Sequence, residues 1–331
     1  MTVIQTRALT KRYGTSQVAA LDDLSVDVGE GVTGLVGTNG AGKSTLIKIL
    51  LGLLTPTSGD AEVLGHDIRS EGAAIRTAVG YMPEHDCLPP DMRAIDFVVH
   101  MGRVSGLPAA AARERAADVL RHVGLAEERY RLMGGYSTGM KQRAKLAQAL
   151  VHDPRLVLLD EPTNGLDPAA RDDMLALVRR IGHDFEIPVL VTSHLLGELE
   201  RISDHVVVLD SGRLLRSKAT QSFLADTGVV LVEVLGERDG RGRDAQTQMG
   251  EALVARGVSC RPLGGLVAIE PVPRGPGEDG PGARGPAEQA LAYDALRDVI
   301  RDTAADLGLG LVRVQPQTGR LEDVFRDEVP A

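Results

Sequence analysis

The sequence predicts an α/β protein with a nucleotide phosphate site, and three observations lead to this class. A glycine-rich loop at Gly37–Ser44, which reads G-T-N-G-A-G-K-S, lies between an apolar strand-like run and an apolar helix-like run. A second apolar run, Leu156–Leu159, ends directly in the acids Asp160 and Glu161. Strand and helix patterns alternate across residues 30–215, which is typical of a largely parallel sheet covered by helices.

The glycine-rich loop fits the phosphate-binding pattern G-x-x-x-x-G-K-[ST]. Glycines let the backbone approach a ligand closely, and successive N–H groups together with the following helix N-terminus attract anions. Lys43 can reach the β- and γ-phosphates, and the Ser44 hydroxyl can ligate Mg²⁺. A plain glycine turn is the alternative, and the loop alone does not identify the enzyme. We expect phosphate contacts from Gly37, Thr38, Asn39, Gly40, Ala41, Gly42, Lys43, Ser44 and Thr45.

Composition narrows the class of protein. The length of 331 residues predicts about two domains. A net charge of −9 argues against a general nucleic-acid binder. The two cysteines, Cys87 and Cys260, form no disulfide or metal-ligand pattern. The N-terminus has no apolar signal region, and no run of 18 apolar residues occurs. We therefore expect no signal peptide and no transmembrane segment.

Residues 1–36 contain candidate strands at Val3–Arg7, Val26–Val28 and Val32–Val36. Tyr13 lies in the first turn, within K-R-Y-G-T. An aromatic ring near a phosphate loop could stack on adenine. Packing of the ring on its own hairpin is the alternative, and the spacing alone favours that alternative.

Two more strands, Asp60–Leu64 and Val79–Met82, follow the loop and are joined by a polar link. Pro83 ends the second strand and leaves Glu84 at its carboxyl end. Ligands bind at this end of strands in open α/β sheets. An ordinary exposed loop acid is the alternative for Glu84.

Residues 91–152 predict a helical subdomain with helices over Met92–Ser105, Pro108–Val123 and Ser137–His152. The last helix opens with S-T-G-M-K-Q-R. Ser137 is a typical N-cap residue, and a helix that opens with Ser and Gly is also a candidate anion site. A plain N-cap is the alternative.

Polar side chains follow two buried strands of the predicted sheet. Burying two adjacent carboxylates destabilises the folded state unless a ligand or a reaction needs their charge. Asp160 therefore fits a magnesium ligand, and Glu161 fits a base that activates water. The strand Val189–Thr192 ends in Ser193 and His194. The histidine could donate to a γ-phosphate, although a lone histidine at such a place is more often structural.

The remainder of the chain differs in pattern. A hairpin at 206–215 closes the first domain, which we place at residues 1–220. Residues 221–331 follow the order β-α-β-β-α-β, which predicts a small α+β domain. A Pro/Gly-rich stretch at about 273–286 is expected to be a mobile loop within it.

Taken together, residues 2–220 resemble the ATP-binding subunit of an ABC transporter. The phosphate loop and the L-V-L-L-D-E-P run resemble the family's Walker A and Walker B motifs, and N-G-L-D and T-S-H resemble its two following loops. The run Y-S-T-G-M-K-Q-R stands where the family has its signature, which other phosphate-loop enzymes lack. K-R-Y-G places Tyr13 where the family stacks adenine.

Two departures from the usual motifs point to a subgroup of the family. Tyr136, Thr138 and Met140 replace residues of the usual L-S-G-G-Q signature, and Glu84 replaces the usual glutamine. Both variants resemble the type-2 exporter subgroup, which includes drug-resistance ATPases. The run L-E-D-V-F at 321–325 also resembles that subgroup, although this match is short.

The resemblance implies a head-to-tail homodimer with ATP between the loop of one copy and the signature helix of the other. It implies that Glu161 activates water, that His194 and Lys43 hold the γ-phosphate, and that Asp160 ligates Mg²⁺ through water. It also implies an integral-membrane permease as partner, at the cytoplasmic face of the membrane. The residues that it places around ATP outside the phosphate loop are Tyr13, Ser137, Gly139 and Asp167, with Ser44, Glu84 and Asp160 around Mg²⁺.

Two other functions remain open on the sequence. A non-transport ABC ATPase of the repair type would need a long coiled coil between Lys43 and Asp160, which are only 117 residues apart. The ribosomal type usually has two cassettes, and this chain has one. A phosphate-loop kinase would need neither a signature helix nor a dimer. An importer subunit fits the variants at Glu84 and Y-S-T-G-M less well than an exporter subunit.

Overall fold

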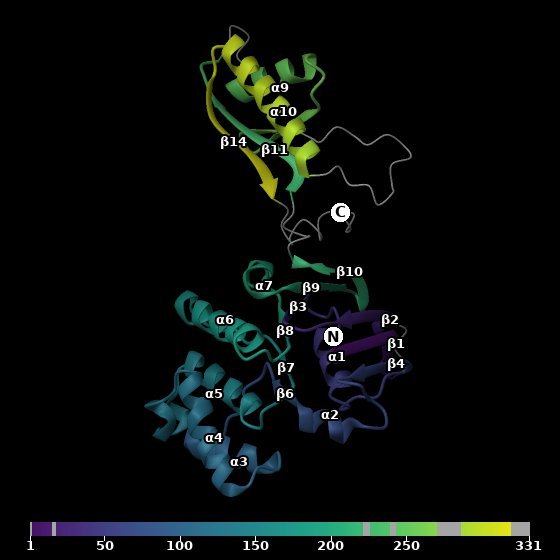
Figure 1. Ribbon diagram of the computed structural model, residues 1–331, viewed down its shortest axis with the longest axis vertical. Coiled ribbons are helices and arrows are strands. Elements are labelled where there is room, and N and C mark those ends of the chain that lie inside the picture. The colour runs from purple at the N-terminus through teal and green to yellow at the C-terminus, as the bar shows by residue number, and fades with distance from the viewer. Residues whose placement is uncertain (1, 15–17, 221–225, 239–242, 270–285, 319–331) are drawn as a thin grey trace. The chain divides into compact units, whose positions relative to one another are not determined.

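The computed structural model describes residues 2–14, 18–220, 226–238, 243–269 and 286–318 (Figure 1). The chain divides into two units, Met1–Phe223 and Leu224–Ala331. Each unit has its own buried apolar cluster. The Pro/Gly-rich stretch at about 273–286 lies outside the described residues, apart from Pro286, where a helix begins, and so does the run at 321–325.

The first unit contains a six-stranded sheet in the order β10-β9-β3-β8-β7-β6. The five strands from β9 to β6 are parallel, and only β10 runs antiparallel to its neighbour. This arrangement confirms the predicted α/β class. The strands are β3 (Val32–Gly37), β6 (Val79–Met82), β7 (Leu156–Leu159), β8 (Val189–Ser193), β9 (His205–Asp210) and β10 (Arg213–Ala219).

A second, antiparallel sheet in the order β2-β1-β4-β5 was not foreseen as a separate layer. Local patterns show strands but not which sheet they join. Buried and exposed residues alternate near the end of β2, as expected for a sheet with one face on the core. Its strands are β1 (Ile4–Arg12), β2 (Ala19–Val28), β4 (Ser58–Val63) and β5 (His66–Asp67).

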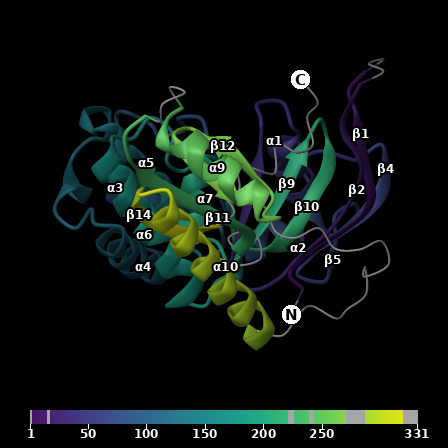
Figure 2. The ribbon, with the colours of Figure 1, turned by 90° about the horizontal axis from the view of Figure 1, so that it is seen from above.

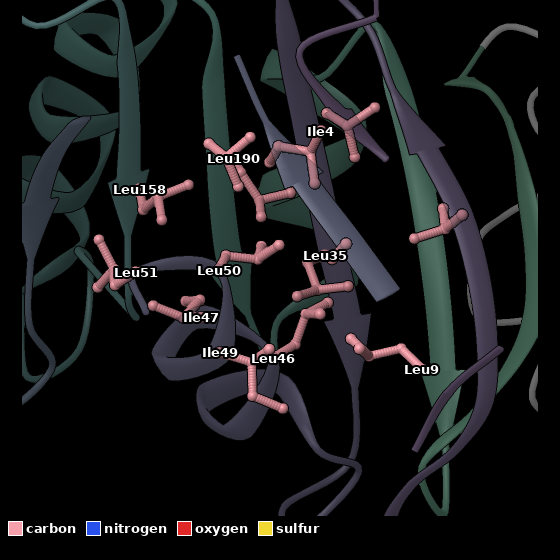
Figure 3. Close-up of a cluster of buried hydrophobic side chains, with 14 of the residues drawn as sticks. Ile4, Leu9, Leu35, Leu46, Ile47, Ile49, Leu50, Leu51, Leu158 and Leu190 are labelled. Atoms are coloured by element: carbon pink, nitrogen blue, oxygen red, sulfur yellow. The ribbon is translucent and has the colours of Figure 1, made fainter. Parts of the chain in front are cut away.

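Helix α1 (Lys43–Leu50) joins the core of the two sheets, because its apolar residues face both. Figure 3 shows Ile47 and Leu50 of α1 near Leu158 and Leu190 of the parallel sheet. Burial of this helix was expected from its nearly all-apolar surface. It ends sooner than the apolar run does, and Leu53 beyond it is exposed.

The other helices of the first unit are α2 (Gly72–Ala78), α3 (Ala94–Val104), α4 (Ala109–His122), α5 (Thr138–Leu150), α6 (Pro168–His183) and α7 (Leu196–Ile202). Figure 1 shows α3, α4 and α5 grouped on the side away from β1, β2 and β4. Helix α2 lies where the sequence suggested only a polar link. It has seven residues, buries only Ile75 and lacks a side-chain cap, so its signal in the sequence is weak.

The second unit has the element order β11, α9, β12, β13, α10, β14, which confirms the predicted β-α-β-β-α-β order. Its sheet runs β12-β13-β11-β14, with every neighbouring pair antiparallel. Figure 2 shows α9 and α10 next to each other, and both contribute to the buried apolar cluster of this unit. The bounds are β11 (Asp226–Leu235), α9 (Ala245–Ala255), β12 (Cys260–Leu263), β13 (Leu266–Ile269), α10 (Pro286–Asp306) and β14 (Gly310–Thr318).

Within the ranges that the structure describes, every helix is too short or too polar to cross a lipid bilayer.

Candidate active site

The glycine-rich loop connects β3 to α1 in a conformation that needs glycine at particular positions. Gly40 and Gly42 have φ values of 88° and 102°, which residues with a Cβ rarely adopt. At Gly42 a Cβ atom would lie 2.4 Å from the carbonyl oxygen of Ala20. The loop backbone is therefore packed closely against β2.

The N-terminus of α1 is open to a ligand. Gly42 is its N-cap and offers no side chain, and the first turn contains no acidic residue. The N–H groups of this turn therefore lack side-chain acceptors. Such a helix end attracts an anion.

A cavity of about 420 Å³ opens over the loop and joins it to the two acids and the histidine. Its lining brings the phosphate loop, Glu84, Asp160, Glu161 and His194 together around one cavity. The lining residues are Ala20, Thr38, Asn39, Gly40, Ala41, Gly42, Lys43, Ser44, Thr45, Glu84, Asp160, Glu161, Asn164 and His194.

Lys43 is held between the loop and the acid at the end of β7. Its Nζ donates to the carbonyl oxygen of Gly37 at 2.7 Å and lies 3.7 Å from Oε1 of Glu161. Both charged side chains are only 8% exposed. A buried cation and a buried acid beside an anion cradle suit phosphoryl transfer.

Glu161 also contacts His194, because Nδ1 of the histidine lies 2.8 Å from Oε2 of the acid. The Glu161 backbone has a φ of 51°, an uncommon value for a residue with a side chain. Such strain gathers at functional sites. Because its Nδ1 contacts Oε2 of Glu161, the histidine can fix the direction in which the carboxylate points.

Thr192 positions both acids and was missed by sequence reasoning. Its hydroxyl donates to Oδ1 of Asp160 and accepts from the Glu161 N–H, both at 2.9 Å. The side chain is fully buried at the carboxyl end of β8. A hydroxyl that ends an otherwise apolar strand was the signal available in the sequence.

The cavity offers a partial magnesium site. Asp160, Glu84 and Ser44 all line it. Within the described part of the chain, no group of three or more His, Cys, Asp or Glu residues could hold a metal ion by itself. Mg²⁺ usually binds one or two carboxylates and takes its remaining ligands from phosphate oxygens and water. These residues therefore fit a magnesium ion that is shared with a nucleotide.

The Glu84 loop is fastened to helix α5. Lys145 Nζ donates to the Glu84 carbonyl oxygen at 2.8 Å, and burial lowers the pKa of this lysine. Lys141 Nζ lies 2.7 Å from Asp86, and this hydrogen bond lowers the pKa of Asp86. Asn164, which sequence reasoning missed, donates to the Glu84 side chain at 3.4 Å.

Burial, with the nearby acids, raises the pKa of Tyr81 to about 12.

Tyr13 lies beside the phosphate loop without lining the cavity. Its hydroxyl is 3.3 Å from the Thr45 hydroxyl, and the ring is 48% exposed. Lys11 Nζ lies 5.4 Å from the ring centroid. The Lys11 contact is compatible with packing of the ring on its own hairpin, and adenine stacking stays a prediction for Tyr13.

Ser137, Gly139 and Asp167 do not line the cavity. Ser137 caps α5 by accepting from the Met140 N–H, and Asp167 caps α6 by accepting from the Ala170 N–H. At Gly139 a Cβ atom would meet only ordinary contacts, the nearest at 3.5 Å. Packing within this chain therefore does not require glycine there, and one copy does not bring these three residues to the phosphate loop.

Comparisons with known proteins agree with this geometry. Residues 21–164 match the family model described as ABC transporter. The chain is 38% identical over 226 residues to the daunorubicin/doxorubicin resistance ATP-binding protein of Streptomyces peucetius, covering 68% of each. It is 35% identical over 256 residues to Nod factor export ATP-binding protein I of Cupriavidus metallidurans, covering 77% of this chain and 84% of that protein. A solved ATP-binding subunit of an ABC transporter is 27% identical, with a TM-score of 0.60 over 67% of this chain and 91% of that one.

Proposed function

We propose that this chain, which belongs to the ABC transporter family, hydrolyses ATP to power a membrane exporter. The observation that carries the proposal is the contact of the buried Glu161 carboxylate with the buried Lys43 and with the half-exposed His194 beside the phosphate loop. It combines a phosphate-binding cation, a base for water and a group that orients the base. The ATPase activity is common to the family, and its use for export is the proposal.

In the proposed reaction, the loop N–H groups and Lys43 hold the β- and γ-phosphates. Glu161 accepts a proton from the water that attacks the γ-phosphorus, and ADP leaves with its β-phosphate oxygen. His194 keeps the Glu161 carboxylate in place and donates to the γ-phosphate. Ser44, Glu84 and Asp160 would hold Mg²⁺, with Asp160 acting through water, and the ion would offset negative charge on the phosphates.

A second copy of the chain would complete the site. One phosphate loop leaves part of the γ-phosphate exposed, and a second helix N-terminus can cover it. Ser137 and Gly139 at the start of α5 do not line the cavity of their own copy, and packing in that copy does not require glycine at position 139. Asp167 at the start of α6 would cross the same interface, and Tyr13 would stack on adenine. ATP would then close a head-to-tail homodimer that hydrolysis reopens.

The chain would act at the cytoplasmic face of the membrane with an integral-membrane permease subunit. The relatives named for drug resistance and for Nod factor export support export of a drug, a lipid or a similar small molecule. Glu84 and the Y-S-T-G-M variant of the signature support the same subgroup. The non-transport ATPase and the kinase lack any comparable support.

The variant Glu161→Gln tests the function. It keeps the shape of the side chain but removes the base, so turnover should fall about 100-fold or more. ATP binding should stay close to that of the wild type, because the loop and Lys43 are unchanged. Steady-state phosphate release and ATP titration measure the two quantities.

Glu127→Gln is the matched control, since it removes an exposed carboxylate from the surface of the same unit. Its turnover should equal that of the wild type. Near-normal hydrolysis by Glu161→Gln would refute the assigned base and, with it, the proposed mechanism.

A further inference from the structure

A buried carboxylate outside the cavity joins three segments of the site. Glu198 lies on α7 and is 6% exposed. Its Oε2 accepts from the Thr163 hydroxyl at 2.7 Å and from the Ser193 hydroxyl at 3.0 Å. Its Oε1 lies 3.1 Å from Nε of Arg171 on α6. None of the roles derived above uses this residue.

Such a side chain is costly to bury. Removal of a carboxylate from water disfavours the folded state unless partners compensate the charge. Here one guanidinium and two hydroxyls surround it, on elements that are distant in the sequence.

Two of the partners of Glu198 lie next to residues to which we assign a role in hydrolysis. Thr163 lies two residues after Glu161, and Ser193 directly precedes His194. The Ser193 hydroxyl also accepts from the Leu195 N–H at 3.0 Å, so it closes the turn that carries the histidine. The Glu198 carboxylate therefore ties the end of β8 to the loop that follows β7.

The third partner, Arg171, lies on α6 near Asp167, which the proposed function places at the interface between two copies. Arg171 lies one turn after Asp167 on α6, and its Nη2 donates to the Leu166 carbonyl oxygen at 3.4 Å. Glu198 thus connects the segment around Asp167 with the turn around His194 through one ion pair and one hydrogen bond.

We propose that Glu198 is a positioning residue that holds His194 against Glu161 and links this contact to the Asp167 segment. The inference rests on the proposed function, because it assumes that His194 and Glu161 act in hydrolysis. Glu198 touches neither the cavity nor a reacting atom, and it acts through its neighbours.

The test is Glu198→Gln in the full chain. The amide oxygen can still accept from both hydroxyls, but the side chain no longer pairs with Arg171. We expect kcat for ATP to fall about tenfold, as misplacement of a catalytic group does. The KM for ATP should stay within about twofold of the wild-type value, because the phosphate loop is untouched.

A double mutant separates positioning from a general structural role. If Glu198 acts through His194, adding Glu198→Gln to His194→Ala should cause no further loss of kcat. Effects that multiply would overturn the inference, and so would a wild-type kcat for Glu198→Gln. A wild-type kcat for His194→Ala alone would instead refute the catalytic assignment under the proposed function.

Two further variants complete the test. Asp172→Asn breaks the neighbouring ion pair between α6 and α7, that of Asp172 with Arg201, which is exposed. It should leave kcat unchanged, and an equal loss there would overturn the inference.

If Glu198→Gln fails to fold, Ser193→Ala removes one of the two hydroxyls and should lower kcat without adding to the loss that His194→Ala causes. Additive loss in that series would equally overturn the inference.

Discussion

At the scale of single residues, the site depends on contacts between neighbouring strands. Thr192 on β8 holds both acids that follow β7, and His194 holds the second of them. Each contact exists because β7 and β8 are parallel neighbours in the sheet. A substitution at Thr192 would therefore displace Asp160 and Glu161 together.

Local motifs predicted some of these residues and not others. Lys43 and the pair Asp160–Glu161 belong to short patterns whose residue types suffice to indicate phosphate chemistry. Thr192 and Asn164 gain their roles from the order of the strands and from the path of a loop. A window of sequence shows a hydroxyl at the end of the β8 strand, but it does not show what Thr192 or Asn164 contacts, so the three-dimensional structure was needed to assign their roles.

Lys43→Ala should abolish measurable ATP binding. The change removes the buried cation that lies over the loop, and it leaves Glu161 without its positive partner, which would repel phosphate. Fluorescence or calorimetric titration with ATP measures the loss. Lys48→Ala is the matched control, because Lys48 lies exposed on the same helix. Retained affinity in Lys43→Ala would contradict the assignment of the loop.

At the scale of elements, two helix N-termini have matching chemistry. Helix α1 begins at the phosphate loop without a side-chain cap or an acidic residue in its first turn. Helix α5 begins at Thr138 after its N-cap Ser137, and its first turn also lacks an acidic residue. Both ends are therefore suited to an anion, although only α1 lines the cavity.

Element existence was predictable where apolar periodicity was strong, as in α1, α3, α4 and α5. Helix α2 was missed because only one of its residues is buried, so no periodic pattern forms. The separate antiparallel sheet was missed because pairing between β1, β2 and β4 is a long-range property. The predicted roles of Ser137 and Asp167 came from resemblance, and the structure shows them as helix caps.

Ser137→Ala should lower stability slightly and turnover strongly. Loss of the α5 N-cap costs about 1 kcal/mol of unfolding free energy, while ATP binding to a single copy should be unchanged. Turnover should fall about tenfold or more, because the second anion site loses its hydroxyl. Thermal melting and steady-state ATPase assays measure these effects.

Asp244→Ala is the matched control for that prediction. Asp244 caps α9 in the second unit by accepting from the Thr247 N–H at 2.8 Å. Its loss should cost similar stability and leave turnover unchanged. Equal ATPase losses in both variants would mean that Ser137 is only a cap.

At the scale of the whole molecule, the chain has two units with separate apolar cores. The phosphate loop and both carboxylates lie in Met1–Phe223. The second unit, Leu224–Ala331, has its own antiparallel sheet and apolar core. We propose that the first unit is the ABC ATPase domain and that the second is an accessory domain, as the sequence predicts for residues 1–220 and 221–331.

The central claim is that two copies of the chain share each ATP site. Light scattering of the slowly hydrolysing Glu161→Gln variant measures this most directly. Without nucleotide we expect the mass of one chain, 35.2 kDa, and with saturating ATP and Mg²⁺ about twice that mass. Adding Ser137→Ala should weaken this dimer. A mass that is the same with and without saturating ATP would contradict the account.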